Sequence, residues 1–237
     1  MSQLPFATEA EMTPFLRRHV RGLAGAPVRW FAEVPAVNGI PDIALVRFDP
    51  TETRRRRRHG LTMTDDLSCI RTALALADHS RLTAAQLAAT TGVSRTVLTG
   101  RVLPTLQESG WVDRQGDGWT ATVRYADPAH LLVSVELKLR DWKRALGQGL
   151  QATTGSDMSW VVLDQRSTAA VDNLKHFAVR NVGLALLGRD RLQIVLPPRQ
   201  SDYDAARRAV YAERLYAMRD AGLEVGPARH VFGRVLI

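Results

Sequence analysis

The chain of 237 residues has a single cysteine and few lysines, and it contains no long apolar run. One cysteine, Cys69, excludes an internal disulfide, which fits a protein of the reducing cytoplasm. No apolar stretch approaches the roughly 18 residues that a membrane-spanning helix needs. The N-terminus also lacks the basic-then-apolar layout of a signal peptide. We therefore expect a cytoplasmic protein with no membrane partner.

The basic residues are 29 arginines and only three lysines, and they leave a net charge of +8. That charge, with a pI near 10.5, favours a polyanionic partner. No basic amphipathic surface helix is apparent, so nucleic acid is a better candidate than an anionic membrane. The histidines have no zinc-ligand spacing, and no glycine-rich phosphate loop or dinucleotide fingerprint is present. Because arginine fills nearly every basic position, each lysine is informative, Lys138 above all.

The chain divides into four segments by composition and periodicity. Residues 1–50 and 125–237 mix strand-like and helix-like segments, which predicts an α/β core with a mixed sheet. Residues 62–124 have mainly helical periodicity and interrupt that core. The connecting residues 51–61 contain five consecutive arginines at 54–58, which no globular core is expected to bury. We interpret them as a basic linker, and solvation and phosphate binding both stay open as its role.

Residues 62–124 have the signals of three helices followed by a hairpin. Thr83 and Ser94 are expected to cap two helices, Gly92 permits the turn between them, and a Gly- and Asp-rich turn separates two strand-like segments. This order resembles a winged helix-turn-helix domain. The resemblance implies that the start of the last helix meets the major groove of DNA, although such domains also bind proteins. The candidate DNA-binding residues are Arg95, Thr96, Thr99 and Arg101 on that helix, and Arg114 and Gln115 in the wing.

A second candidate site lies in residues 131–139, an apolar run that predicts a central strand. Side chains two residues apart share one face of a strand, so Glu136 and Lys138 should lie side by side. Burying these charges costs several kcal/mol unless they are paired or hold an ion. They are therefore a structural ion pair, part of an edge-strand face, or part of a functional site.

A third charged residue favours the functional site. Asp42 follows Pro41 at the mouth of another predicted strand, residues 43–48. Pro-Asp at one strand, then Glu-x-Lys on a strand that leads into a helix, resembles the PD-(D/E)XK nuclease superfamily with its restriction-endonuclease-like fold. The matching residues are Pro41, Asp42, Glu136 and Lys138. An inserted winged helix at 62–124 explains the long gap between Asp42 and Glu136.

The resemblance implies a divalent-metal-dependent DNA endonuclease with Asp42, Glu136 and Lys138 as its catalytic residues. Asp42, Glu136 and the backbone carbonyl of Leu137 would hold Mg²⁺ or Mn²⁺, hard cations that prefer oxygen ligands. Such a metal lowers the pKa of bound water and stabilises charge on the scissile phosphate. Lys138 would orient or deprotonate the attacking water.

Two further residues are candidates for this site. Glu11 lies on the first predicted helix, where it is either an additional metal-site acid or, with Thr8, a capping box. Gln148 resembles the glutamine that some relatives use to position substrate, although Ala152 stands where their tyrosine follows.

The alternative to a nuclease is a non-catalytic DNA-binding regulator on a degenerate nuclease scaffold. The intact Asp42, Glu136 and Lys138 argue against it, because drift would be expected to erase at least one of them. An RNA-directed nuclease is a third reading, and the winged helix favours double-stranded DNA instead. The sequence is compatible with a homodimer as well as with a single copy.

Overall fold

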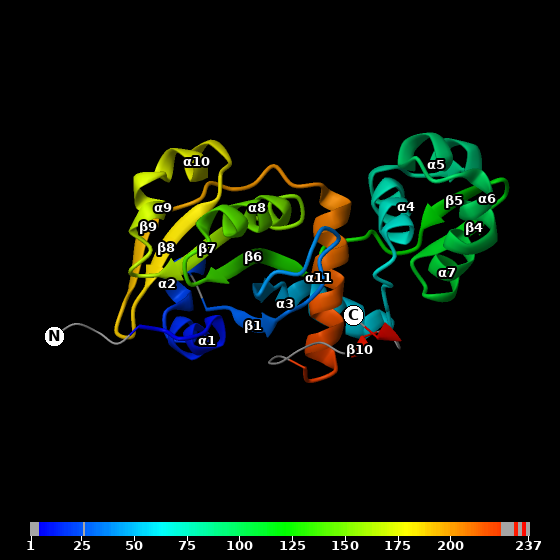
Figure 1. Ribbon diagram of the computed structural model, residues 1–237. Coiled ribbons are helices and arrows are strands. Elements are labelled where there is room, and N and C mark those ends of the chain that lie inside the picture. The colour runs from blue at the N-terminus through cyan, green and yellow to red at the C-terminus, as the bar shows by residue number, and fades with distance from the viewer. Residues whose placement is uncertain (1–4, 26, 224–229, 232–233, 236–237) are drawn as a thin grey trace.

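The computed structural model describes residues 5–25, 27–223, 230–231 and 234–235. Its main sheet has six strands in the order β1-β2-β6-β7-β8-β9 (Figure 1). The strands are β1 (Arg29–Ala32), β2 (Ile43–Phe48), β6 (Ala129–Lys138), β7 (Met158–Asp164), β8 (Gly183–Leu187) and β9 (Leu192–Leu196). β6, β7 and β8 run parallel, and the other neighbours are antiparallel. The prediction of a mixed α/β fold with a mixed sheet is confirmed.

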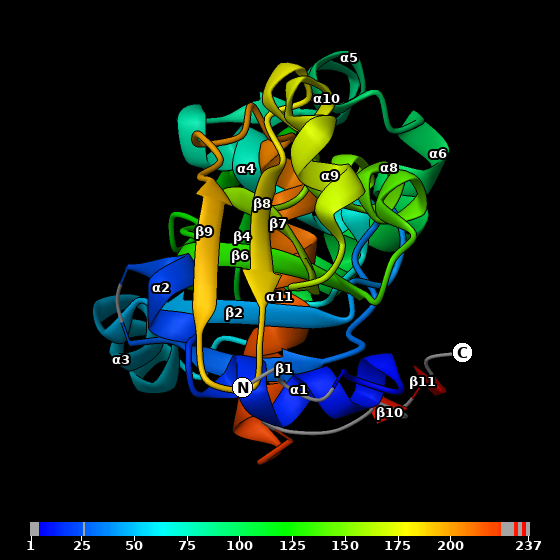
Figure 2. The same cartoon turned by 60° about the vertical axis from the view of Figure 1, so that its left-hand side comes forward.

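Helices cover both faces of this sheet. They are α1 (Glu9–Arg17), α2 (Val20–Ala24), α8 (Trp142–Ala152), α9 (Thr168–Asp172), α10 (Leu174–Val179) and α11 (Ala205–Asp220). Side chains of β6 alternate between the two faces, as the period of a strand requires. Val133 and Val135 pack with α1, whereas Leu132 packs with α11. Figure 2 shows α2 and α8 on opposite sides of β8.

The helical pattern of residues 169–180 predicts one helix, but the structure has two short ones there, α9 and α10. At the C-terminal end, β10 (His230–Val231) pairs only with β11 (Arg234–Val235) among the described residues. The strand predicted at 230–236 lies partly outside the described residues. No helix in the described part of the chain is long and apolar enough to cross a membrane.

Residues 51–61, predicted as a basic linker, instead form most of helix α3 (Pro50–His59). Asp49 caps the start of the helix by accepting from the backbone N–H groups of Thr51 and Glu52. Proline at the first position has the right φ for a helix, and Gly60 ends it with a φ of 61°. The linker prediction was therefore wrong, because these capping signals outweigh the charge of the run.

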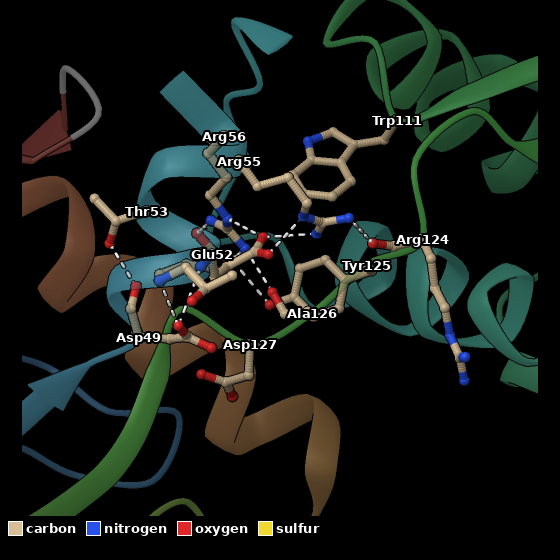
Figure 3. Close-up of polar contacts among 12 residues, drawn as sticks. Asp49, Glu52, Thr53, Arg55, Arg56, Trp111, Arg124, Tyr125, Ala126 and Asp127 are labelled. Atoms are coloured by element: carbon tan, nitrogen blue, oxygen red, sulfur yellow. Dashed lines mark hydrogen bonds and ion pairs between the residues drawn. The ribbon is translucent and has the colours of Figure 1, made fainter. Parts of the chain in front are cut away.

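The helical phase of α3 sends one arginine of the run into the interior. Arg56 is only 2% exposed and donates to both carboxylate oxygens of Glu213, at 2.7 and 2.8 Å. It also donates to Glu52 at 2.8 Å and lies over the ring of Trp111, 5.2 Å from its centroid (Figure 3). Tyr125 donates its hydroxyl to the same Glu213. The expectation that no core could bury this run fails for Arg56, whose charge is neutralised by two carboxylates.

Residues 62–124 form the predicted series of helices and a hairpin. The elements are α4 (Leu67–Asp78), β3 (Leu82–Thr83), α5 (Ala84–Thr91), α6 (Arg95–Val97), η1 (Leu98–Val102), α7 (Leu103–Glu108), β4 (Val112–Gln115) and β5 (Gly118–Ala121). Thr83 and Ser94 cap α5 and α6, and Gly92 ends α5 with a φ of 69°. The caps and the turn predicted from the sequence are thus present.

The last helix of this segment contains a wider, π-helical turn, η1. The N–H of Leu103 donates to the carbonyl of Leu98, five residues earlier. Pro104 follows directly, and a proline inside a helix has no N–H to donate and collides with the carbonyl four residues before it. The wider turn accommodates that proline, a detail that periodicity alone does not predict.

The core of the 62–124 segment is shared with the main sheet's helix α11. Ala206, Ala209 and Val210 of α11 belong to the same buried cluster as the apolar residues of α4, α5 and α7. Tyr125, just after the segment, belongs to it as well. In Figure 1 the segment accordingly lies beside α11. The facing apolar positions of its helices predict a core of the segment's own, and this prediction is wrong because α11 completes that core.

Candidate functional site

The antiparallel pairing of β2 with β6 brings the predicted site residues together. Ile43 is opposite Val135, so the start of β2 lies next to the end of β6. Asp42, directly before β2, accepts from the N–H of Leu137 at 2.7 Å and from Nζ of Lys138 at 3.3 Å. Nζ of Lys138 also donates to the carbonyl of Leu137 at 2.7 Å. Residues more than ninety positions apart in the sequence thus meet where β2 begins and β6 ends, in the interior of the sheet.

Glu136 is the most deeply buried charged residue of this group, with 2% of its surface exposed. Its Oε2 has no hydrogen-bond partner among the residues that the structure describes. Burial, together with the nearby carboxylate of Asp42, raises the pKa of Glu136 to about 8, although the charge of Lys138 opposes this. Without a further positive charge beside it, this carboxyl is therefore held largely in its neutral form at pH 7.

Lys138 stays charged in this environment. Burial alone would lower its pKa, but the carboxylates of Asp42 and Glu9 outweigh burial and raise the pKa overall. A lysine that holds its proton is suited to orienting water or stabilising negative charge. It is poorly suited to deprotonating water, the other role that the sequence left open.

The acid that contacts Lys138 from the first helix is Glu9. Its Oε2 lies 3.3 Å from Nζ of Lys138, and it lines a cavity of about 340 Å³ together with Asp42 and Glu33. No motif in the sequence marks Glu9. Its place beside Lys138 follows from the packing of α1 against the sheet.

Glu11, the residue proposed from the sequence, serves mainly the start of α1. Its carboxylate accepts from the N–H of Ala7 at 3.0 Å, and its own N–H donates to the hydroxyl of Thr8 at 3.3 Å. It also lies 3.8 Å from Arg189. This geometry agrees with the capping interpretation of Glu11 and not with a direct contact to Lys138.

Gln148 lies close to Glu136, as its candidate role requires. Both residues line a small cavity of about 40 Å³ that also includes Pro41. Oε1 of Gln148 and Oε2 of Glu136 are buried acceptors, and neither has a donor among the described residues. A buried acceptor without a donor costs free energy, and the cavity has room for a water molecule or an ion.

The oxygens at this end of β6 are of the kind that divalent cations prefer. Asp42 and Glu136 supply carboxylates and Leu137 a carbonyl, hard ligands suited to Mg²⁺ and Mn²⁺, and the Leu137 carbonyl accepts from Nζ of Lys138. Within the described ranges, no group of three or more His, Cys, Asp and Glu residues is arranged to hold a metal ion. Two carboxylates are enough for Mg²⁺, which keeps several of its waters.

The predicted DNA-binding residues lie on the surface of the 62–124 segment. Arg95 and Thr96 are exposed at the start of α6, and Arg114 and Gln115 are exposed in the hairpin. The hydroxyl of Thr99 donates to the carbonyl of Arg95. Arg101 donates to Asp66, the cap of α4, at 2.7 Å, and is therefore held against the protein.

The site therefore combines three carboxylates, an ammonium group and oxygens without donors in the described residues, where β2 begins and β6 ends. Such a set can bind a cation and place a fixed positive charge beside an anionic substrate. Its residues come from β2, β6 and α1, so the fold of the sheet determines their positions. Comparison with family models, with curated proteins and with solved structures finds no match for this chain.

Proposed function

We propose that this chain is a divalent-metal-dependent DNA endonuclease that hydrolyses phosphodiester bonds. The observation that carries the proposal is the buried oxygen of Glu136, which has no donor in the described structure and lies beside Asp42 and Lys138. The neutral carboxyl of Glu136 needs no counter-charge, but its ionised form does, and Lys138 already contacts Asp42 and Glu9. A bound metal ion would supply that charge and favour the ionised form of Glu136.

Each residue has a defined role in this proposal. Asp42, Glu136 and the carbonyl of Leu137 would hold Mg²⁺ or Mn²⁺, and a bound metal would supply polarisation of the scissile phosphate and activation of water. Lys138 keeps its charge and would orient the attacking water or stabilise negative charge that develops on the phosphate. Glu9 positions the ammonium group of Lys138, because the two groups are 3.3 Å apart.

The proposal includes a restriction-endonuclease-like core with an inserted winged helix as the DNA-reading part. The helix order, the caps and the hairpin of residues 62–124 support this interpretation, as does the exposure of Arg95 and Thr96 at the start of a helix. The excess of eight positive charges favours a duplex as the partner.

Incubation with supercoiled plasmid tests the activity. We expect nicked or linear plasmid with Mg²⁺ or Mn²⁺ and no product with EDTA. Asp42→Asn should abolish the reaction, because it removes a metal ligand that also contacts Lys138. Asp172→Asn, an exposed carboxylate on α9, is the matched control and should cut normally. A folded protein that binds DNA but leaves the plasmid intact in every metal would instead support the regulator.

A further inference from the structure

A second polar feature lies away from the candidate metal site, at the other end of β2. A cavity of about 860 Å³ opens between the β1–β2 edge, α3 and the end of α11. Its charged lining residues are Arg29, Arg47, Arg54, Arg57, Arg219 and Asp220. Five arginines and one aspartate thus line the cavity, and Arg57 and Arg219 share Asp220. Like charges gathered in one cavity repel each other unless an anion offsets them.

Arg219 forms a fixed base of this cavity. Its side chain is 11% exposed, and its guanidinium lies 4.6 Å from the ring centroid of Phe48 and 4.2 Å from that of Tyr216. It donates to Asp220 at 2.8 Å and to the hydroxyl of Thr53 at 3.2 Å. An arginine held between two rings and two acceptors is preorganised, so little side-chain entropy is lost when a ligand binds.

The arginine run of α3 supplies the next part of the cavity. Arg54 and Arg57 are three residues apart and therefore share one side of the helix, whereas Arg56 points into the core. Arg57 lies 3.8 Å from Asp220, and Arg54 donates only to the hydroxyl of Thr51, at 3.4 Å. Neither Arg47 nor Arg54 is paired with a carboxylate in the described part of the chain. Their charges remain available to a ligand.

We propose that this cavity binds phosphate groups of a duplex DNA backbone, as a second DNA contact separate from the 62–124 segment. The inference rests on the proposed function, which makes DNA the partner. Guanidinium groups bind phosphate oxygens through paired hydrogen bonds, and several arginines around one cavity suit a phosphodiester chain. The turn of helix α3 then gives arginines of the run different roles. Arg56 points into the core and is structural, whereas Arg54 and Arg57 line the cavity and bind phosphate.

The position of the cavity fits a duplex that also reaches the candidate metal site. The cavity of about 340 Å³ beside Asp42 and Glu33 lies at one end of the β1–β2 pair. Arg29 and Arg47, which line the arginine-rich cavity, lie at the other end. The five steps from Asp42 to Arg47 along the strand span about 17 Å. That distance corresponds to about five base pairs of rise along a duplex.

Fluorescence anisotropy with a labelled 20-base-pair duplex, in EDTA and over a range of salt concentrations, tests the proposal. The test protein is Arg47→Gln/Arg54→Gln. The control is Lys175→Gln/Arg180→Gln, which removes the same charge from exposed positions on α10 and directly after it. We expect the test variant to bind about tenfold more weakly at 0.1 M salt, with a salt slope reduced by about two, and the control to bind within twofold of wild type.

The outcomes separate this proposal from the proposed nuclease activity, because EDTA removes any dependence on cleavage. Equal affinities and salt slopes for the two double variants would overturn the phosphate site, even if the wild type cuts plasmid. A wild type without affinity for the duplex would overturn it as well. Weaker binding of Arg47→Gln/Arg54→Gln alone supports the site, even if no metal produces cleavage. Both variants change exposed side chains, so their melting temperatures should equal that of the wild type.

Discussion

Buried charges in this chain fall into two groups at the scale of single residues. Arg56 and Arg208 have carboxylate partners that neutralise them: Arg56 is paired with Glu213, and Arg208 with Asp157 at 2.8 Å. Glu136 differs, because one of its oxygens is buried without a donor in the described structure. Buried polar groups in native proteins are nearly always satisfied, so this oxygen is expected to have a partner, such as a water molecule or an ion. The contrast supports a structural role for Arg56 and a ligand-binding role for Glu136.

The structural role of Arg56 leads to a stability prediction. Arg56→Met should lower the free energy of unfolding by about 3–5 kcal/mol, because it leaves the buried carboxylate of Glu213 without its main partner. Arg58→Met, in the same run but exposed, should change it by less than about 0.5 kcal/mol. Urea denaturation of both variants measures the difference, and equal stabilities would show that Arg56 is not the structural arginine.

The two acids of the first helix should also differ. Glu9→Gln should slow metal-dependent cleavage roughly tenfold or more, because Glu9 positions the ammonium group of Lys138. Glu11→Gln should leave the rate unchanged and cost at most about 1 kcal/mol of stability through the helix start. Plasmid cleavage rates and thermal melts of the two variants test this. The reverse ranking of the rates would restore Glu11 as the site acid.

At the scale of elements, local signals predicted most of the structure. The strand 43–48, the caps Thr83 and Ser94, and the β8–β9 hairpin follow from alternation and turn chemistry. The failure at α3 arose because five charges were given more weight than Asp49, Pro50 and Gly60, which define a helix start and end. The partner that buries Arg56 is 157 residues away, and no local pattern reveals it.

The candidate site was only partly predictable from the sequence for a related reason. The two-residue period of a strand is local, so it places Glu136 and Lys138 on one face. Asp42 was identified through a family resemblance, and the β2–β6 register then places it beside them. Glu9 depends on how α1 packs on the sheet, which requires the tertiary structure.

The helix that is expected to read DNA gives a prediction at this scale. Arg95→Ala should weaken duplex binding by about 1–3 kcal/mol if Arg95 contacts a base edge, since it is exposed at the helix start. Arg101→Ala should have a smaller effect on binding, because Arg101 is already paired with Asp66. Titrations of both variants against one duplex decide the order, and a larger loss for Arg101 would contradict it.

At the scale of the whole molecule, α3 and α11 join the 62–124 segment to the main sheet. Cluster residues of α11 complete the core of the segment, and Arg56 of α3 joins Glu213 of α11 to Trp111 of the segment (Figure 3). The segment is therefore held against α3 and α11 and is not connected to the sheet by a loose linker. Such an arrangement would fix the direction in which a duplex bound by the segment leaves it.

Two deletions test this arrangement. Replacing residues 62–124 by a short Gly/Ser linker keeps α3 and its Arg56–Glu213 pair, whereas replacing 51–124 removes both. We expect the first core to be folded, with a melting temperature well above that of the second, because Glu213 then keeps its buried partner. Circular dichroism melts of the two proteins give the comparison. Equal melting temperatures would show that α3 adds nothing to the stability of the core and serves only as a linker.

The most direct test of the central claim is a comparison of Glu136→Gln with the wild type. The substitution keeps the shape of a side chain that is 2% exposed, so the fold and duplex affinity should be unchanged. If Glu136 holds a catalytic metal, cleavage of plasmid with Mg²⁺ or Mn²⁺ should fall to the level seen in EDTA. Wild-type cleavage by a folded, DNA-binding Glu136→Gln protein would contradict the assignment of the metal site.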